Sequence, residues 1–565
     1  MKKLIAIFLT LFVTIFAGTV LAQDDLSRGM SLLDKKDCAG ALPYLQRAVK
    51  EDSRSAKANT YLGKAYLCLG KLDSATIFLK KAIDLSDEFS PAYSSLGEIY
   101  MQQKNYAEAI NNFRDAVKND SKNSSYVISL GYAYLAADSL DGAMKAFYKA
   151  RDMNDKDPRV LEGIGDVYRK QGILDPAIEN YKEALQLDSL NVPLRLKLAN
   201  TYMKNNDGAD AYEQFVKVSS LEPNNPDGQY QAGELLFLNK RYREAFPFLE
   251  KYHQLVPSDD KTLLQLAESA LNAQLYPDAV KYYQEYLAKN PNSLVAKKSL
   301  AAAYYFGKKP LDSYNTYKAI PIDSLNVREL VRYGLAANAV HDTSAAIDAW
   351  SRAVKLDTTQ SEIEYLLANA LFSAKRYNEA ITYFQKRLAL EPNDVAAELN
   401  MGLCYFIVQD YGNAVAALRR VTVLKPDNYQ GNLWLARALV FDDSLESAAD
   451  VYGTFIKIAQ ADTSGNHSSD LNEAYRQIAL SYVVQGSKFQ KDNPDEAKKY
   501  YLQAMNDINL ALKYDSKDIR THVLLAQTLA LLGKIDDACK ECKLILKADP
   551  SNKEILKLSK SLGCE

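Results

Sequence analysis

Apolar residues recur along this chain at helical spacing, in short runs that polar residues interrupt. In the stretch 90–123, one apolar stripe runs from Tyr93 to Tyr100 and a second from Ala109 to Val117. The polar segments QQKNY and NDSKN follow the two stripes. Because residues three and four apart share one face of a helix, the pattern predicts a helix, a short turn, a second helix and a closing turn rich in capping side chains.

Small residues mark equivalent places in successive copies of this pattern. Two series, each with a step of 34 residues, run 12 positions apart along the chain. They indicate one supersecondary unit that is copied many times, in which each small side chain leaves room for a large one on the facing helix. The first series is Gly29, Gly63, Gly97, Gly131, Gly165, Ala199, Gly233, Ala267 and Ala301, and the second is Ala41, Ala75, Ala109, Ala143, Ala177, Ala211, Ala245 and Ala279.

The order of residues within one unit resembles the tetratricopeptide repeat family. The family's small residue, aromatic, Ala, aromatic and Ala appear as Gly97, Tyr100, Ala109, Phe113 and Ala116. The resemblance covers nearly everything after residue 22, and it implies an all-α, right-handed α-solenoid of about fifteen stacked helix-turn-helix units. The family's turn proline is present as Pro223, Pro257, Pro291, Pro392, Pro426 and Pro550.

The repeat is irregular at two points, which we interpret as joints of one solenoid. Gly334 follows Ala301 by 33 residues, and the polar segment DTSGNHSSD follows Ala461. A stretched unit, a final regular unit and a terminal solvating helix near 553–563 come after it. The expected parts are therefore an N-terminal array at 23–326, a second array at 327–462 and an irregular C-terminal part at 463–565.

Residues 1–22 follow a different pattern. Lys2 and Lys3 precede an apolar run that ends with the small residues Val20 and Ala22, as in a secretory signal peptide. An uncleaved membrane anchor is the alternative, because an apolar run of this length nearly spans a bilayer. Either interpretation places the repeats outside the cytoplasm, and we expect a bacterial periplasmic or envelope protein.

The charge balance narrows the class of partner. The chain has 69 Lys and Arg against 71 Asp and Glu, with both signs interspersed. No basic stripe for nucleic acid and no polybasic patch for membranes is apparent. We therefore expect a protein or peptide partner, no nucleic acid, and no membrane contact beyond the leader.

The six cysteines suggest that both ends of the solenoid are cross-linked. Cys38 lies near the start of a second helix, and Cys68 lies near the end of the following first helix, so antiparallel packing brings them close. Cys539 and Cys564 have the same relation. In an exported protein we therefore predict the disulfides Cys38–Cys68 and Cys539–Cys564, with small apolar core filling as the alternative.

No constellation of catalytic residues is visible. The four histidines lie in separate units, and the sequence has no P-loop, GxSxG or dinucleotide fingerprint. Cys539 and Cys542 form a C-x-x-C on a helix without a preceding strand, and no second pair completes a zinc site. We expect no enzyme, no cofactor and no metal.

Function is therefore expected on the inner face of the solenoid, which the first helix of each unit lines. Inward positions are the second, fifth and ninth of each unit, and aromatic and Arg side chains gathered there resemble binding hot spots. The alternative is that these aromatic residues belong to the repeat core. The candidates are Tyr230, Glu234, Tyr305, Arg328, Tyr365, Asn369, Asn400, Trp434 and Arg437.

Two functions fit this pattern. The first is a non-enzymatic scaffold of the cell envelope that binds a partner in the concave groove. The alternative is an envelope module that binds a cell-wall or exported glycan, because Tyr rings stack on sugars. A carboxylate clamp of the chaperone-docking kind does not fit, because one Asn pair (Asn369 and Asn400) matches but the required lysines are missing.

Overall fold

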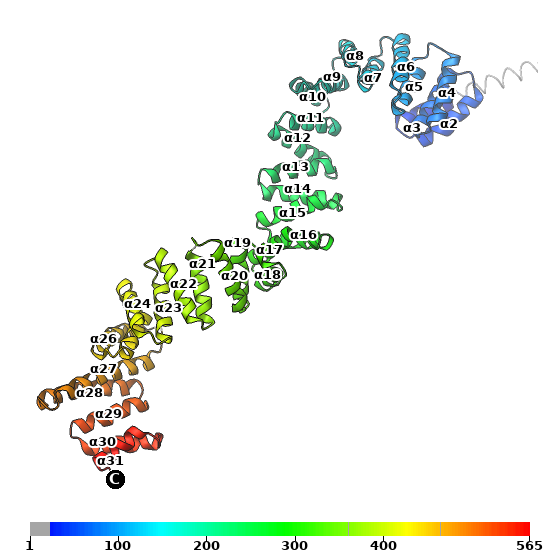
Figure 1. The fold of residues 1–565 in the computed structure, drawn as a ribbon. Coiled ribbons are helices and arrows are strands. Elements are labelled where there is room, and N and C mark those ends of the chain that lie inside the picture. Colours follow the sequence, from blue (N-terminus) through cyan, green and yellow to red (C-terminus); the bar gives the residue numbers. More distant parts are fainter. Residues whose placement is uncertain (1–22, 360, 464, 565) are drawn as a thin grey trace, which may run out of the picture. The chain divides into compact units, whose positions relative to one another are not determined.

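The structure, a computed structural model, describes residues 23–359, 361–463 and 465–564. All regular secondary structure in these residues is helical. The chain divides into two compact units, the first ending at Gln274 and the second beginning at Leu275, and each is described by itself (Figure 1). The all-α solenoid of helical hairpins expected from the sequence is confirmed.

Unit 1 is a succession of hairpins in which each helix packs against its neighbours in sequence. Its elements are a helical stretch at 23–34, α2 (Cys38–Glu51), α3 (Ala56–Cys68), α4 (Leu72–Leu85), α5 (Ser90–Gln102), α6 (Tyr106–Asn119), α7 (Ser124–Ala136), α8 (Leu140–Met153), α9 (Pro158–Gln171), α10 (Leu174–Leu187), α11 (Val192–Lys204), α12 (Gly208–Leu221), α13 (Pro226–Leu238), α14 (Tyr242–Leu255) and α15 (Asp260–Asn272).

Unit 2 continues the alternation of first and second helices. Its elements are α16 (Tyr276–Lys289), α17 (Leu294–Phe306), α18 (Pro310–Lys318), the 3-10 turn η1 (Ile322–Ser324), α19 (Val327–Ala339), α20 (Thr343–Leu356), α21 (Ser361–Ser373), α22 (Tyr377–Leu390), α23 (Val395–Ile407), α24 (Tyr411–Leu424), α25 (Tyr429–Phe441), α26 (Leu445–Ala461), α27 (Ser468–Phe489), α28 (Pro494–Tyr514), α29 (Ile519–Leu531), α30 (Ile535–Ala548) and α31 (Lys553–Leu562).

Local sequence sets where the helices begin and end. Most first helices start at polar caps, as where Ser55 accepts a hydrogen bond from the Ala58 N–H at 3.1 Å. They end in a residue with positive φ, such as Lys104 at 58°, after which the Asn105 N–H donates to the Tyr100 carbonyl. The two ends fix the length of each helix and the sharp turn between the helices of a hairpin.

The small residues of the first series are required by the packing within each hairpin. A Cβ added to Gly97 would lie 2.7 Å from the ring of Phe113, and one added to Gly131 would lie 2.7 Å from Phe147. Phe113 and Phe147 are buried, as is Ala109 of the second series. The close approach of the two helices therefore depends on the missing side chain.

The two irregular points of the sequence are also irregular in the structure. Near the first, α18 has only nine residues and η1 follows it, with Tyr314 and Tyr317 filling the interior. After the second, α27 and α28 are extended to 22 and 21 residues. The terminal helix expected near 553–563 is α31.

Two disulfides join the cysteine pairs that the sequence predicted. Cys38 bonds Cys68, with 6.1 Å between their Cα atoms, and Cys539 bonds Cys564, with 5.3 Å. Cys404 and Cys542 are free and buried. Burial raises the pKa of the Cys404 thiol to about 12, so this side chain stays protonated and acts as apolar filling.

The predicted leader, residues 1–22, lies outside the described residues. Among the helices that the structure describes, none combines the length and the apolar character needed to span a bilayer.

Substituting Gly334 tests the packing rule. A Cβ at this position would lie 2.6 Å from Cε2 of the buried Trp350, so Gly334→Ala should lower the stability of the fold by about 1–3 kcal/mol. In the Trp350→Phe background the same substitution should lower the stability less, because the smaller ring leaves room for the added Cβ. Urea unfolding followed by circular dichroism measures both effects, and equal costs in the two backgrounds would contradict the rule.

The disulfides should stabilise the helices at each end. Replacing Cys38 and Cys68 by Ser should remove about 3 kcal/mol locally, because the cross-link no longer restricts the unfolded chain. Hydrogen exchange should accelerate in α2 and α3 and stay unchanged in α29–α31. The Cys539→Ser, Cys564→Ser variant is the matched control with the opposite pattern. Equal acceleration at both ends in either variant would contradict local stapling.

Candidate partner-binding surfaces

The first helices of successive hairpins touch one another, as α3 touches α5 and α7 touches α9, so their outward side chains share one surface. We name this surface the first-helix face and count places so that the small residue of the first series is the eighth. The second, fifth and ninth places are those expected to bind a partner, but the fifth place is buried in some hairpins, as at Thr60 and Leu433.

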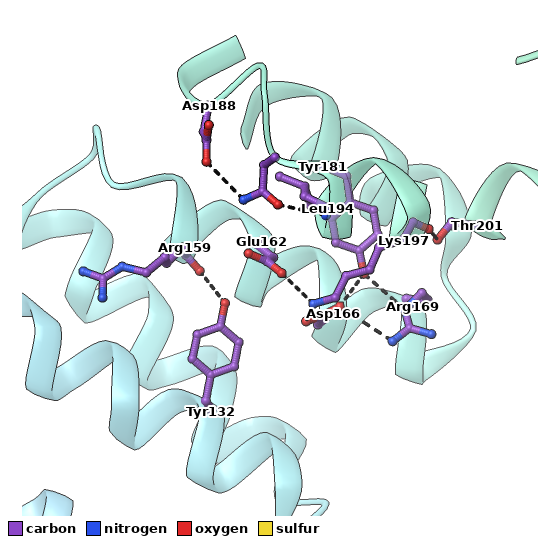
Figure 2. Close-up of polar contacts among 11 residues, drawn as sticks. Tyr132, Arg159, Glu162, Asp166, Arg169, Tyr181, Asp188, Leu194, Lys197 and Thr201 are labelled. Atoms are coloured by element: carbon purple, nitrogen blue, oxygen red, sulfur yellow. Dashed lines mark hydrogen bonds and ion pairs between the residues drawn. The ribbon is translucent and has the colours of Figure 1, made fainter. Parts of the chain in front are cut away.

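The densest polar cluster on the first-helix face of unit 1 surrounds Lys197. Figure 2 shows Lys197 of α11 reaching between Glu162 and Asp166 of α9, with its Nζ 2.6 Å from an oxygen of each carboxylate. The other Asp166 oxygen accepts from the Tyr181 hydroxyl at 2.6 Å, and Arg169 Nε donates to the same hydroxyl at 3.1 Å. The network thereby joins α9, α10 and α11.

The charges of this cluster balance within the protein. Burial lowers the pKa of Lys197, but Asp166 and Glu162 outweigh that effect and raise it above the ordinary value. Burial, reinforced by Asp166, raises the pKa of Tyr181, which stays a neutral donor. Because every charged group has a partner, the cluster organises the surface and offers no free acid or base for catalysis.

A pocket opens on the same face at the start of unit 1. It has a volume of about 470 Å³. Gln23, Leu26 and Met30, at the second, fifth and ninth places of the first hairpin, form one wall, and Lys57 and Ala58 of α3 form part of the other. Four of its nine lining residues, Gln23, Leu26, Met30 and Lys57, therefore stand at places where contact with a partner was expected.

The structure brings Tyr230 and Glu234 together through a third residue. Lys261 of α15 lies 3.2 Å from the Tyr230 hydroxyl and 3.2 Å from a Glu234 oxygen. The Tyr230 ring also packs 5.1 Å from that of Tyr252. These residues form a second polar cluster on the first-helix face of unit 1.

In unit 2 the predicted asparagines form a pair. Asn400 Nδ2 of α23 donates to Asn369 Oδ1 of α21 at 2.9 Å, and Asn369 Nδ2 donates to the Tyr365 carbonyl at 2.9 Å. The Tyr365 ring lies beside Phe384 and under the guanidinium of Arg387. Three of the nine candidate residues therefore lie together on α21 and α23.

Arg437 is engaged inside the protein. Its guanidinium lies 2.8 Å from Glu473 and 3.0 Å from Asp470, both on α27, and also covers the ring of Trp434. Burial raises the pKa of Glu473, but hydrogen bonds and the charge of Arg437 outweigh it and hold that pKa below the usual value. The ion pairs attach α25 to the elongated hairpin and leave Arg437 little freedom to bind a partner.

The remaining candidates lie apart from these clusters. Tyr305 of α17 packs against the Phe306 ring at 5.4 Å, and Arg328 is exposed at the start of α19. In the part of the chain that the structure describes, neither contacts the Asn369–Asn400 pair.

Lys197, at the sixth place, is the main omission of the sequence-based prediction. Lys197 and Asn400 both occupy it, and each bonds the ninth-place residue of the preceding first helix, Asp166 or Asn369. Glu162 and Asp166 stand at the fifth and ninth places. Listing the second, fifth and ninth places of every hairpin of unit 1 would therefore have found them. Asn400 was among the candidates, whereas finding Lys197 required knowing how α9 and α11 lie against each other.

Removing the Lys197 charge should destabilise unit 1. Lys197→Met leaves Asp166, whose side chain is 7% exposed, beside Glu162, and should cost about 2–3 kcal/mol at pH 7. Lys182→Met, which removes an exposed pair with Glu179, is the control and should cost less than about 0.5 kcal/mol. Urea unfolding measures both variants, and equal losses of stability in the two would contradict a stabilising role for the Lys197 charge.

Comparison with protein families finds repeats along much of the chain. The model described as "Tetratricopeptide repeat" matches residues 26–89, 95–158 and 196–260, and a further model with that description matches 261–293. A "TPR repeat" model matches 165–206. Residues 339–421 match "Anaphase-promoting complex, cyclosome, subunit 3". No enzymatic family is indicated, and no curated protein matches this chain.

Solved structures with similar folds include three bacterial proteins. A thermophilic TPR protein of Thermus thermophilus is 22% identical, covering 32% of this chain and 99% of that one, with a TM-score of 0.30. The C-terminal part of a TPR repeat-containing protein of Cytophaga hutchinsonii is 21% identical. The match covers 46% of this chain and 98% of that one, with a TM-score of 0.33. A tetratricopeptide repeat protein of Parabacteroides merdae is 17% identical. The match covers 44% of this chain and 98% of that one, with a TM-score of 0.26.

Proposed function

This chain belongs to the tetratricopeptide repeat family, and on that premise we propose that it is a non-enzymatic scaffold of the bacterial cell envelope. In this proposal an extended segment of a partner protein lies in the concave groove that the first-helix face lines. Stacked helical repeats provide such long binding surfaces because each repeat adds one more helix to the groove.

The Asn369–Asn400 pair is the observation that carries the proposal. A side-chain amide has two donors and a carbonyl acceptor. Asn400 uses one donor on Asn369 and, among the described residues, makes no other side-chain hydrogen bond. Its free Oδ1 and N–H match the N–H and C=O of a peptide backbone. The charged cluster around Lys197, by contrast, satisfies its own groups.

The envelope location rests on two features of the chain. The N-terminal sequence has the pattern of a signal peptide, and the two disulfides are compatible with an oxidising compartment outside the cytoplasm. Buried free thiols such as Cys404 are consistent with both locations and do not decide between them.

Photo-crosslinking in cells tests the groove. A crosslinking amino acid at Tyr365 should capture an envelope protein, and Asn369→Ala with Asn400→Ala should lower the yield at least about tenfold, because two backbone contacts are lost. The matched control is Asn112→Ala, which removes a surface amide on second helix α6. Added cell-wall glycan fragments should not compete.

Two results would contradict the proposal. Unchanged crosslinking in the double Asn variant would exclude the pair as a contact. Competition by glycan fragments would favour the glycan-binding alternative. Circular dichroism of the double variant separates loss of binding from loss of fold, because a core role for the pair would lower the helical signal.

A further inference from the structure

Two equivalent aromatic stacks lie in unit 2. In each, the tyrosine that opens a second helix stacks on the phenylalanine that ends the next first helix. Tyr276 lies 5.9 Å from Phe306 with 21° between the ring planes, and Tyr411 lies 5.2 Å from Phe441 with 19°. The two sites can therefore be compared as copies of one arrangement.

The protein itself covers the first stack with a cation. Arg332, from the next first helix α19, places its guanidinium carbon 5.1 Å from the centre of the Phe306 ring. A guanidinium binds an aromatic face well, because it is planar, weakly hydrated and attracted by the electron-rich ring. This arrangement shows which chemistry the Tyr–Phe stack accepts.

The second stack lacks such a cover. Phe441 is 57% exposed, and no cation lies over Tyr411 or Phe441 in the part of the chain that the structure describes. Phe406 packs edge-on against both rings and against Trp434. These four rings form a continuous aromatic surface that opens to solvent at Phe441.

The charge next to the second stack is also reversed. The turn after Phe306 carries Lys308 and Lys309, whereas the turn after Phe441 carries Asp442 and Asp443. Both aspartates are exposed, and neither forms an ion pair with another described residue. The open stack therefore combines aromatic faces with two unbalanced carboxylates.

We propose that this edge, formed by Phe406, Tyr411, Phe441, Asp442 and Asp443, binds an arginine-bearing basic segment of a partner protein. The guanidinium occupies the place over Phe441 that Arg332 occupies over Phe306, and the two carboxylates supply the matching charge. The proposal does not depend on the proposed function, because neither Asn369 nor Asn400 belongs to this site. Binding weakens with salt, because the carboxylates are exposed.

The tryptophans of the chain allow the site to be followed directly. Trp350 is buried, and Trp434 lies 5.2 Å from Phe406 in the aromatic surface. Trp350→Phe therefore leaves one reporter beside the site, and phenylalanine already fills the equivalent place at Phe113. Titration of the full chain with a tetra-arginine peptide should give a saturable change in Trp434 fluorescence that weakens between low and high salt.

Variants of the edge give the decisive comparison. Phe441→Ala should weaken tetra-arginine binding at least about fivefold, and Asp442→Asn with Asp443→Asn at least about threefold. Asn is tolerated at position 443, where φ is 56°, so the fold should persist. Phe306→Ala, in the stack already covered by Arg332, is the matched control. It should bind tetra-arginine with the same affinity as the Trp350→Phe protein. Circular dichroism confirms folding of each variant.

Three results would overturn the proposal. One is unchanged tetra-arginine binding in Phe441→Ala, and another is equal weakening in Phe306→Ala. The third is a change dependent on Phe441 when a tetra-glutamate peptide or a cello-oligosaccharide replaces tetra-arginine, which would assign the rings to a different ligand class.

Discussion

The close contact between a small residue on each first helix and a large side chain on its second helix determines the architecture. Gly97 opposite Phe113 and Gly334 opposite Trp350 are two instances, and in both a single added carbon meets the ring. The contact sets the distance between the helices of a hairpin, and the hairpin then has apolar faces that only the next hairpin can cover. The regular 34-residue spacing, the short turns and the common surface of the first helices all follow.

Because that surface is built by stacking, its chemistry depends on what neighbouring first helices place side by side. Around Lys197 the neighbours balance each other's charges and tie three helices together. At Asn369 and Asn400 the same relation between places gives neutral amides with hydrogen-bonding groups to spare. One geometry thus produces a charged, self-satisfied cluster in one repeat and, in the proposed function, a contact for a peptide backbone in another.

The sequence was sufficient for the parts of the structure that depend on local pattern. The hairpins, the irregular repeats near 310 and 462 and both cysteine pairs follow from spacing, because antiparallel neighbours bring fixed positions together. It was less informative about side chains that meet across repeats. Arg437 was predicted as a partner contact, but residues of the elongated α27 bind its guanidinium. Lys197 was not singled out, because its role depends on how α9 and α11 pack together.

The most direct test of stacking is the removal of one complete repeat. Deleting residues 90–123, which contain α5 and α6, should let α4 pack against α7 as equivalent neighbours. Circular dichroism should then show the same helical signal per residue as the full chain, because every remaining hairpin keeps a neighbour on each covered face. Deleting α5 alone should lower that signal. A collapse of the helical signal after the 34-residue deletion would contradict the account.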